Sequence, residues 1–423
     1  MSTIPTGRFR RLFRLASLGP RLGGAMVGGE GMRRAVAERM LHTLGELKGG
    51  SMKVGQILAQ VADALPEEVR ERLEGLFHDA PSLPWKEMRP VVEAELGSLD
   101  GFAWFDTEPF AGASLGQVHG AVLPDGRVVA VKIQYPHVEE ALSQDIANLR
   151  QFAQLGTAGG LVFDISAQLA AMQDTLEGEL DYRRELAALR CMRAVMARWP
   201  DLVVPEPIEA LCTGRVLTTV LLEGPTLHEV DGHLPEPERV RLAEQLTRAV
   251  FGPVLVGAVI NADAHPGNFV VMEDGRLGLL DFGAVREVPR STAEGLRGLL
   301  AAMLDDPEED PVPHLQRMGF DFDPDNRRVR RSSEAMRAAI APCFTGVHDF
   351  ADDHTMEALM DIKRRHPLDS VHWVPPPATL HLMRAAMGWL HGQRLLGVKC
   401  DLSEVMADLV VSTQPKERQL GVG

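Results

Sequence analysis

The chain has 423 residues, 45% of them hydrophobic and 24% charged, so it can bury the cores of two lobes with extensions. Its formal net charge of -15 argues against a nucleic-acid-binding protein, because such a protein needs a basic surface to displace counterions. The 4 cysteines are far apart and form no CxxC pair. The sequence therefore signals neither a zinc site nor a disulfide framework, and it fits a reducing cytoplasm.

The N-terminus differs in charge from the rest of the chain. Its first 29 residues hold five arginines and no acidic residue, so the remainder carries -20. Apolar side chains interleave with these arginines, as in a segment that lies on anionic lipid; a tail held against the acidic body is an equal alternative.

No apolar signal-peptide segment follows the arginines, and no apolar run of the chain reaches the roughly 18 residues of a membrane span. We expect a cytoplasmic protein with, at most, peripheral membrane contact. The arginines are Arg8, Arg10, Arg11, Arg14 and Arg21.

The periodicity of apolar residues changes along the chain. Residues 33–77 show helical periodicity, with one stripe made of Val54, Ile57, Leu58, Val61 and Leu65. From about residue 105 the period is two, and the segment GQVHGAVLPDGRVVAVKIQ (116–134) predicts a hairpin that turns at PDG.

Helices and strands then alternate, which predicts an α+β two-lobe fold. The expected domains are a basic tail with a helical extension, an N-terminal lobe with a small sheet and one long helix, and a helical C-terminal lobe. Their bounds are 1–104, 105–222 and 223–423. The expected elements are helices over about 138–155 and 165–198, strands over 203–224 with a turn at Thr213 and Gly214, and helices from 235 onward interrupted by a strand pair around 268–281.

A lysine and a run of small residues lie on the predicted hairpin. Lys132 closes the apolar strand VAVK, which alone is most often the solvated end of a strand. Small side chains just upstream would let backbone N–H groups approach a phosphate, as in the loop that covers a nucleotide. An ordinary tight turn is the alternative. The small residues are Ala111, Gly112, Ala113 and Ser114.

Three polar residues match the kinase pattern. Asp263 and Asn268 have the spacing of the aspartate and asparagine in a kinase catalytic loop, and Asp281 begins a DFG tripeptide after an apolar strand. In that pattern the first aspartate faces the reacting oxygen, while the asparagine and the DFG aspartate hold Mg²⁺ against the phosphates. The uncharged run 249–260 is interpreted as a buried helix that delivers this loop rigidly.

A carboxylate is needed to orient the lysine. In the helix predicted over 165–198, Glu177, Asp181 and Glu185 are four residues apart and share one face, whereas Glu179 points elsewhere. One of these acids is expected to turn inward toward Lys132.

Together these motifs resemble the UbiB family of atypical kinase-like proteins, also called the AarF or ADCK family, and most of all its coenzyme Q-supporting branch. The resemblance spans roughly residues 6–395. The motifs are KVGQ (53–56), AGASLGQVH (111–119), VAVKIQYP (129–136), ELDYRRE (179–185), NADAHPGN (261–268) and DFGAVRE (281–287).

The resemblance implies a protein-kinase-like fold with an N-terminal extension whose KxGQ segment covers the active site. It implies binding of ATP or ADP with Mg²⁺, and ATPase activity that supports ubiquinone biosynthesis at a membrane with quinone-biosynthesis proteins as partners. The implied roles are Asp263 as the catalytic aspartate, Asn268 and Asp281 as metal ligands, Lys132 paired with Glu185, and Lys53 and Gln56 meeting Glu179 and Asp181.

The sequence departs from the family pattern at three positions. Gly112 stands in a loop that often keeps alanine, Asn261 replaces the usual histidine, and Ala264 replaces the usual proline. None of these positions is an implied metal ligand. His265 is interpreted as structural, because the kinase pattern gives it no role in phosphate chemistry.

Several functions fit these residues. An atypical ATPase or small-molecule kinase is the leading hypothesis, and a scaffold that uses nucleotide occupancy to present a lipid is the alternative. A protein kinase is disfavoured, because the helical pattern resumes within about ten residues of DFG and leaves little room for a peptide-docking segment. A metal hydrolase built on Asp263, His265 and Asp281 would leave Lys132 and the small-residue run unexplained.

Overall fold

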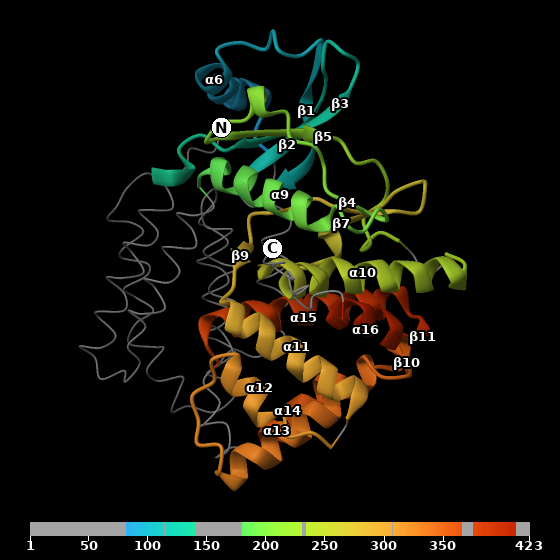
Figure 1. Ribbon diagram of the computed structural model, residues 1–423. Coiled ribbons are helices and arrows are strands. Elements are labelled where there is room, and N and C mark those ends of the chain that lie inside the picture. The colour runs from blue at the N-terminus through green and yellow to red at the C-terminus, as the bar shows by residue number, and fades with distance from the viewer. Residues whose placement is uncertain are drawn as a thin grey trace, which may run out of the picture. The chain divides into compact units, whose positions relative to one another are not determined.

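The computed structural model describes residues 82–113, 115–140, 180–230, 234–306, 308–365 and 375–411. The chain divides into two compact units, Met1–Arg184 with Pro207–Leu221, and Glu185–Glu206 with Leu222–Gly423. Figure 1 shows the elements of both. The helices predicted over 33–77 and 138–155 lie wholly or mostly outside the described residues. The three-part division at 104 and 222 stays a prediction.

The first unit contains a four-stranded antiparallel sheet in the order β1-β2-β3-β5. The predicted hairpin is confirmed, because β2 and β3 pair along their whole length around a turn in which Gly126 has φ 90°. Glycine adopts this left-handed backbone without strain. The strands are β1 (Trp104–Ala113), β2 (Gly116–Val122), β3 (Val128–Gln134) and β5 (Val216–Val220).

Strand β3 separates two kinds of side chain. Val129, Val131 and Ile133 are fully buried in the apolar core of this unit, together with residues of helix α6 (Trp85–Leu96). Because successive side chains of a strand point to opposite faces, Lys132 and Gln134 lie on the other face. The alternation of apolar residues along this strand therefore also directs the Lys132 side chain away from the apolar core.

The strands predicted over 203–224 form only in part. The turn at Thr213 is confirmed, since its N–H donates to Val216 O (2.7 Å) and β5 follows. Between β4 (Leu202–Val203) and that turn the chain instead forms a 3₁₀ turn over Glu209–Leu211. Prolines at 205 and 207 interrupt the strand pattern, because proline cannot donate to a ladder.

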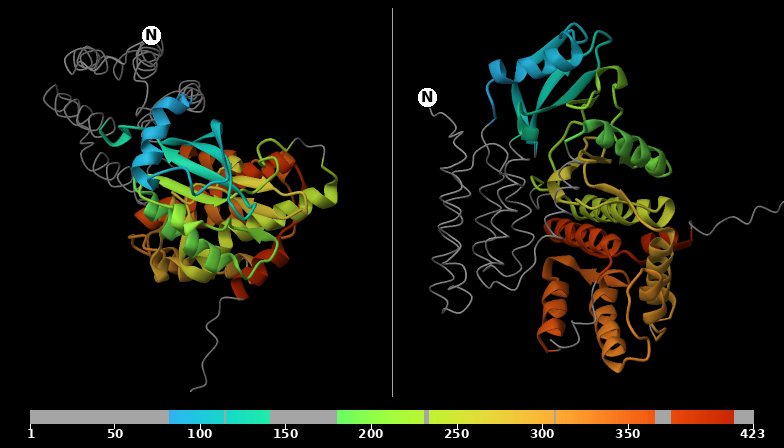
Figure 2. Two further views of the ribbon diagram at one scale, coloured as in Figure 1. Left: turned by 90° about the horizontal axis from the view of Figure 1, so that it is seen from above. Right: turned by 90° about the vertical axis from the view of Figure 1, so that its left-hand side faces the viewer.

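The second unit is mainly helical, as predicted. Helices α10 and α15 lie side by side in Figures 1 and 2, and α13 and α14 lie on the other side of α15. Among the described helices of the whole chain, none is long and apolar enough to cross a membrane. The helices are α9 (Tyr182–Met196, whose first turn belongs to the first unit), α10 (Glu236–Gly257), α11 (Arg290–Asp305), α12 (Val312–Arg317), α13 (Arg327–Ile340), α14 (Thr355–Arg365), α15 (Pro377–Leu396) and α16 (Ser403–Val411).

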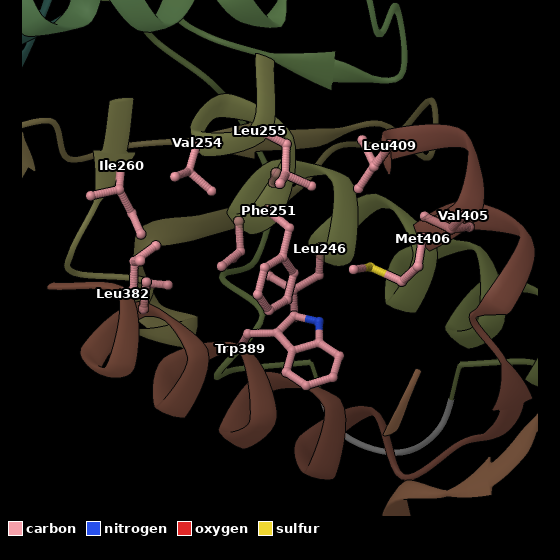
Figure 3. Close-up of a cluster of buried hydrophobic side chains, with 14 of the residues drawn as sticks. Leu246, Phe251, Val254, Leu255, Ile260, Leu382, Trp389, Val405, Met406 and Leu409 are labelled. Atoms are coloured by element: carbon pink, nitrogen blue, oxygen red, sulfur yellow. The ribbon is translucent and has the colours of Figure 1, made fainter. Parts of the chain in front are cut away.

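An aromatic cluster holds α10 and α15 together. The Trp389 ring lies edge-on to Phe251 (5.3 Å between centroids) and stacks on Phe344 (5.1 Å), as the core close-up in Figure 3 shows for the first pair. Its indole N–H donates to Thr247 Oγ1 at 3.0 Å, so its buried polar atom is satisfied. This core supports the loop that leaves α10.

The buried helix predicted over 249–260 is correct for most of its length but ends earlier. Helix α10 closes at Ala258, which adopts a left-handed conformation (φ 52°). Val259 and Ile260 instead belong to strand β6 (Val259–Asn261), which pairs with β9 (Val285–Glu287). The prediction of a strand pair around 268–281 is confirmed by β7 (Phe269–Val271) and β8 (Leu277–Leu279).

Two small ladders were missing from the prediction. They are β6–β9 and β10–β11, the latter made of Val347–Asp349 and Lys399–Asp401. Each of these strands is three residues long. A segment this short carries too little periodicity to be distinguished from its helical surroundings.

Candidate active site

The loop predicted to be catalytic begins at the end of β6 and folds back on itself. Asn268 donates a hydrogen bond from Nδ2 to the backbone carbonyl of Asp263 (3.1 Å). The five-residue spacing seen in the sequence therefore corresponds to a direct contact. An amide NH2 group can only donate, so Oδ1 is the atom of Asn268 that is suited to bind a cation.

Asn261 joins this loop to the DFG segment. Its Nδ2 donates to the backbone carbonyl of Asp281 (2.8 Å), and its Oδ1 accepts from the N–H of Asp263 (3.1 Å). The position that departs from the family pattern thus connects the two aspartates expected to carry the chemistry.

The DFG turn is held by its own side chains. The Gly283 N–H donates to Asp281 Oδ1 (2.8 Å), and the Arg286 guanidinium donates to the carbonyls of Gly283 (2.9 Å) and Val285 (2.8 Å). Phe282 is 1% exposed and anchors the turn in the core. The Gly283 contact orients the carboxylate of Asp281, and the contacts of Arg286 and Phe282 hold the backbone of the turn.

Glu185 lies beside the same turn. It is in the first turn of α9 and is buried, and a Cβ built on Gly283 would be 4.0 Å from its Oε2 and 3.3 Å from Asp281 Oδ1. The second unit therefore brings together carboxylate and amide oxygens, the hard ligands that Mg²⁺ prefers. Asp281 and Asn268 fit such an ion by the chemistry of their atoms, and their roles stay a prediction.

Lys132 belongs to the first unit, in the middle of β3. Its backbone lies between Val118 of β2 and Leu217 of β5, so paired strands hold it on both sides. Its Nζ lies 5.1 Å from the centroid of the Tyr182 ring. The sequence pattern did not single out this tyrosine.

The small residues form the tip of a hairpin. Ala111, Gly112 and Ala113 end strand β1 and pair with Val118, Gln117 and Gly116 of β2. They are therefore strand residues before a tight turn, and Ser114 lies outside the described residues. Among the described residues, no atom lies within 4 Å of a Cβ built on Gly112.

The expectation that Asp181 and Glu185 share a helix face is wrong. Helix α9 begins at Tyr182, and the carboxylate of Asp181 accepts the N–H of Arg183 (3.0 Å), as a capping residue does. Asp181 thus ends the preceding loop, while Glu185 faces the interior one turn later. Three more residues expected at the site lie outside the described residues: Lys53, Gln56 and Glu179.

The sequence of residues 75–311 matches the ABC1 atypical kinase-like domain, more than half of the chain. The chain belongs to the ABC1 atypical kinase-like family. This confirms the resemblance drawn from the motifs and the kinase-like fold. Every described residue expected at the active site lies inside the matched segment.

Known members of this family support the assignment. The chain is 32% identical to atypical kinase coq-8, mitochondrial, of Caenorhabditis elegans (68% of this chain, 39% of the relative) and 35% identical to atypical kinase COQ8B, mitochondrial, of Rattus norvegicus (63% and 53%). It therefore matches about half or less of these relatives. A solved structure, the Rv3197–erythromycin complex from Mycobacterium tuberculosis, superimposes with a TM-score of 0.64 and 26% identity, covering 89% of this chain and 96% of that one.

Gly388 of α15, beyond the ABC1 match, packs on the catalytic loop. A Cβ built on Gly388 would lie 2.5 Å from the Ala264 carbonyl oxygen and 2.7 Å from its carbon. Real Cβ atoms essentially never approach a backbone this closely, so only glycine fits here. In the sequence, this contact is indicated only by a glycine inside a helical pattern, and such a glycine does not tell which segment packs against it.

Three imidazole rings lie close together at the same loop. The rings of His228 and His391 lie 6.0 and 6.2 Å from that of His265, whose Nδ1 accepts the N–H of Gly267 (3.1 Å). Partial burial, reinforced by the charges of His228 and Arg394, lowers the pKa of His391. The contact with Gly267 agrees with a structural role for His265.

A second polar cluster lies outside the ABC1 match. The ligand atoms of Cys343, His348 and Asp353 lie within 4.8 Å of one another, a C-x4-H-x4-D set that the search for CxxC pairs missed. However, Asp353 Oδ2 accepts from Arg394 (2.9 and 3.0 Å), and its Oδ1 accepts from Thr355 (2.6 Å) and His348 (3.0 Å). Burial also raises the pKa of the Cys343 thiol to about 11, so the thiol stays protonated. We interpret this cluster as a structural ion-pair network.

Proposed function

We propose that this chain is a Mg²⁺-dependent ATPase or small-molecule kinase that supports ubiquinone biosynthesis at a membrane surface. The observation that carries the proposal is the pair of hydrogen bonds by which Asn261 joins Asp263 to Asp281. This bond pattern links the residue that would orient the nucleophile to the residue that would hold the metal. Such fixed positioning is the main source of catalysis in phosphoryl transfer.

The predicted site residues have separate roles in this proposal. Asp263 accepts a hydrogen bond from the attacking water or hydroxyl and so aims it at the terminal phosphate. Asn268 and Asp281 would hold Mg²⁺, which neutralises charge on the phosphates when bound. Lys132 binds phosphate oxygens, and the small side chains at 111–114 would let backbone N–H groups approach them.

A small acceptor is favoured over a peptide. Helix α11 begins at Arg290, only seven positions after Gly283, which leaves little chain for a peptide-docking segment. The structural neighbour was solved with erythromycin, which is consistent with a small organic molecule as the ligand of this fold. The role in quinone biosynthesis rests on the resemblance to the coenzyme Q-supporting branch and on relatives named as mitochondrial atypical kinases.

Phosphate release from Mg-ATP by the purified chain tests the chemistry. We expect turnover in the wild type, loss of turnover with retained nucleotide binding in Asp263→Ala, and loss of Mg-dependent binding in Asp281→Asn. The matched control is Asp274→Asn, which changes an exposed aspartate in the β7–β8 turn. Unchanged Mg-ATP binding and turnover in Asp281→Asn would refute the proposal.

Two further measurements test whether the protein works at a membrane surface and whether it supports ubiquinone biosynthesis. Anionic liposomes should stimulate phosphate release if the enzyme works at a membrane, whereas neutral liposomes should not. The chain should also restore ubiquinone content in a deficient host that lacks its own family member. If Asp263→Ala restores ubiquinone as well as the wild type does, the chain acts as a nucleotide-gated scaffold instead.

A further inference from the structure

Lys132 and Gln134 point from β3 toward one short segment of the chain. Gln134 is buried and donates from Nε2 to the backbone carbonyl of Leu180 (2.7 Å). Two residues earlier on the same face of the strand, the Lys132 ammonium lies 5.1 Å from the centroid of the Tyr182 ring. Two side chains on one face of β3 thus contact the short segment Leu180–Tyr182, which leads into α9.

Tyr182 is held firmly in this position. It is 3% exposed, and its backbone N–H donates to the carbonyl of Gly214 (2.9 Å) just before β5. The next residues of α9 are capped by Asp181, which accepts from the N–H of Arg183. Because its backbone is held by these hydrogen bonds, the Tyr182 ring has a defined position beside the Lys132 ammonium.

We propose that Tyr182 is a positioning residue for Lys132. The face of an aromatic ring attracts an ammonium group, and the attraction strengthens when both are shielded from water. Contact with the ring occupies one side of the ammonium and so limits the directions in which its N–H groups can donate. The ring restricts the long lysine side chain before the nucleotide arrives and so lowers the entropy lost on binding.

This inference rests on the proposed function, in which Lys132 binds the phosphates. The added claim is that Tyr182, the first residue of α9, affects how tightly Lys132 binds the phosphates. The effect is assigned to the ring, because the ammonium lies over the face of the ring, 5.1 Å from its centroid. Phenylalanine should therefore substitute for Tyr182, and an aliphatic side chain should not.

The test measures the dissociation constant for Mg-ATP in full-length variants. Tyr182→Leu should weaken binding about 3- to 30-fold, the range expected for losing one cation–π contact. Tyr182→Phe should change it by less than about twofold. Tyr182→Met supplies a second aliphatic variant of larger volume, in case leucine leaves a cavity that prevents folding.

Two comparisons separate positioning from general destabilisation. Met192→Ala removes a buried side chain later in the same helix and should lower the melting temperature without changing Mg-ATP binding at 20 °C or below. In a Lys132→Ala background, Tyr182→Leu should have no additional effect, because the lysine it positions is gone.

The outcomes distinguish this inference from the proposal on which it rests. If Lys132→Ala binds Mg-ATP as tightly as the wild type, the proposed function fails. If Lys132→Ala weakens binding but Tyr182→Leu and Tyr182→Met do not, only the positioning role is overturned. It is also overturned if Tyr182→Phe loses as much affinity as Tyr182→Leu, or if Tyr182→Leu weakens binding equally with and without the lysine.

Discussion

The side-chain amide of Asn261 donates a 2.8 Å hydrogen bond to the backbone carbonyl of Asp281. The two residues belong to separate motifs of the sequence, and the β6–β9 ladder brings them together through the pairing of Asn261 with Val285. The residue that replaces the family's usual histidine is therefore a bridge between the catalytic loop and the DFG turn.

Removing this bridge should slow catalysis. Asn261→Ala removes the hydrogen bonds to both Asp263 and Asp281, and small misplacements of reacting groups are costly. We expect kcat for phosphate release to fall about 10- to 100-fold, with little change in the nucleotide dissociation constant. Asn326→Ala is the control, because it removes a remote helix cap and should affect only stability. An unchanged kcat in Asn261→Ala would show that the bridge is dispensable.

A methyl group at position 388 should disturb the catalytic loop. Glycine to alanine inside a helix usually stabilises a protein, but here the new Cβ would meet the Ala264 carbonyl at 2.5 Å. We expect Gly388→Ala to lower the free energy of unfolding by about 1–3 kcal/mol and to reduce kcat. Gly120→Ala, where no described atom lies within 4 Å of the new Cβ, should leave both values near wild type. Stabilisation by Gly388→Ala would contradict the packing described here.

Breaking the Asp353 network should destabilise the second unit. Asp353→Asn leaves the Arg394 guanidinium, which is 38% exposed, without its carboxylate, and losing hydrogen bonds to a charged group costs about 1.5–3 kcal/mol. Urea unfolding at pH 7 measures the loss. Asp352→Asn, at the exposed neighbouring position, is the matched control. Equal unfolding midpoints for the two variants would refute the structural role.

The same network predicts a pH dependence. Burial opposes ionisation of Asp353, but hydrogen bonds from Thr355, His348 and Arg394 outweigh it and hold its pKa below the ordinary 3.8. The ionised carboxylate therefore adds stability above about pH 4 that is lost as the pH falls through the folded-state pKa. The difference between wild type and Asp353→Asn should shrink in that acidic range.

His119 should make the first unit sensitive to mild acid. It is fully buried and contacts the Asp106 carbonyl (2.9 Å) and Gln117 Nε2 (2.9 Å). The amide nitrogen can only donate, so the ring is neutral with its proton on Nδ1, which donates to the carbonyl. Burial lowers the pKa of His119 below 6.5, so the unfolded chain binds this proton more readily and stability falls as the pH drops below about 6.5.

Unfolding by urea at pH 8 and pH 5.5 checks this expectation. The wild type should lose more stability between these values than His119→Gln does. His137→Gln, which changes an exposed histidine of the same unit, should behave like the wild type. Equal pH dependence in the wild type and His119→Gln would contradict a neutral buried ring.

Local periodicity and spacing were sufficient for much of the architecture. The alternation in 116–134 and its PDG turn predicted β2 and β3, because the period of a strand and the backbone of its turn depend on adjacent residues. The spacing from Asp263 to Asn268 likewise predicted a loop that the structure shows to be closed by their hydrogen bond. Short strands such as β6 and the early end of α10 at Ala258 were missed, since pairing with a distant strand decides them.

The family, the kinase-like fold class and the residue types suited to phosphate chemistry were predictable from the sequence, because they depend on short motifs with fixed spacing. Folding, by contrast, brings Asn261 between two motifs, Gly388 against Ala264 and Tyr182 beneath Lys132. Each of these contacts joins residues far apart in the chain. Their distances depend on how helices and sheets pack, which no local pattern of residues specifies.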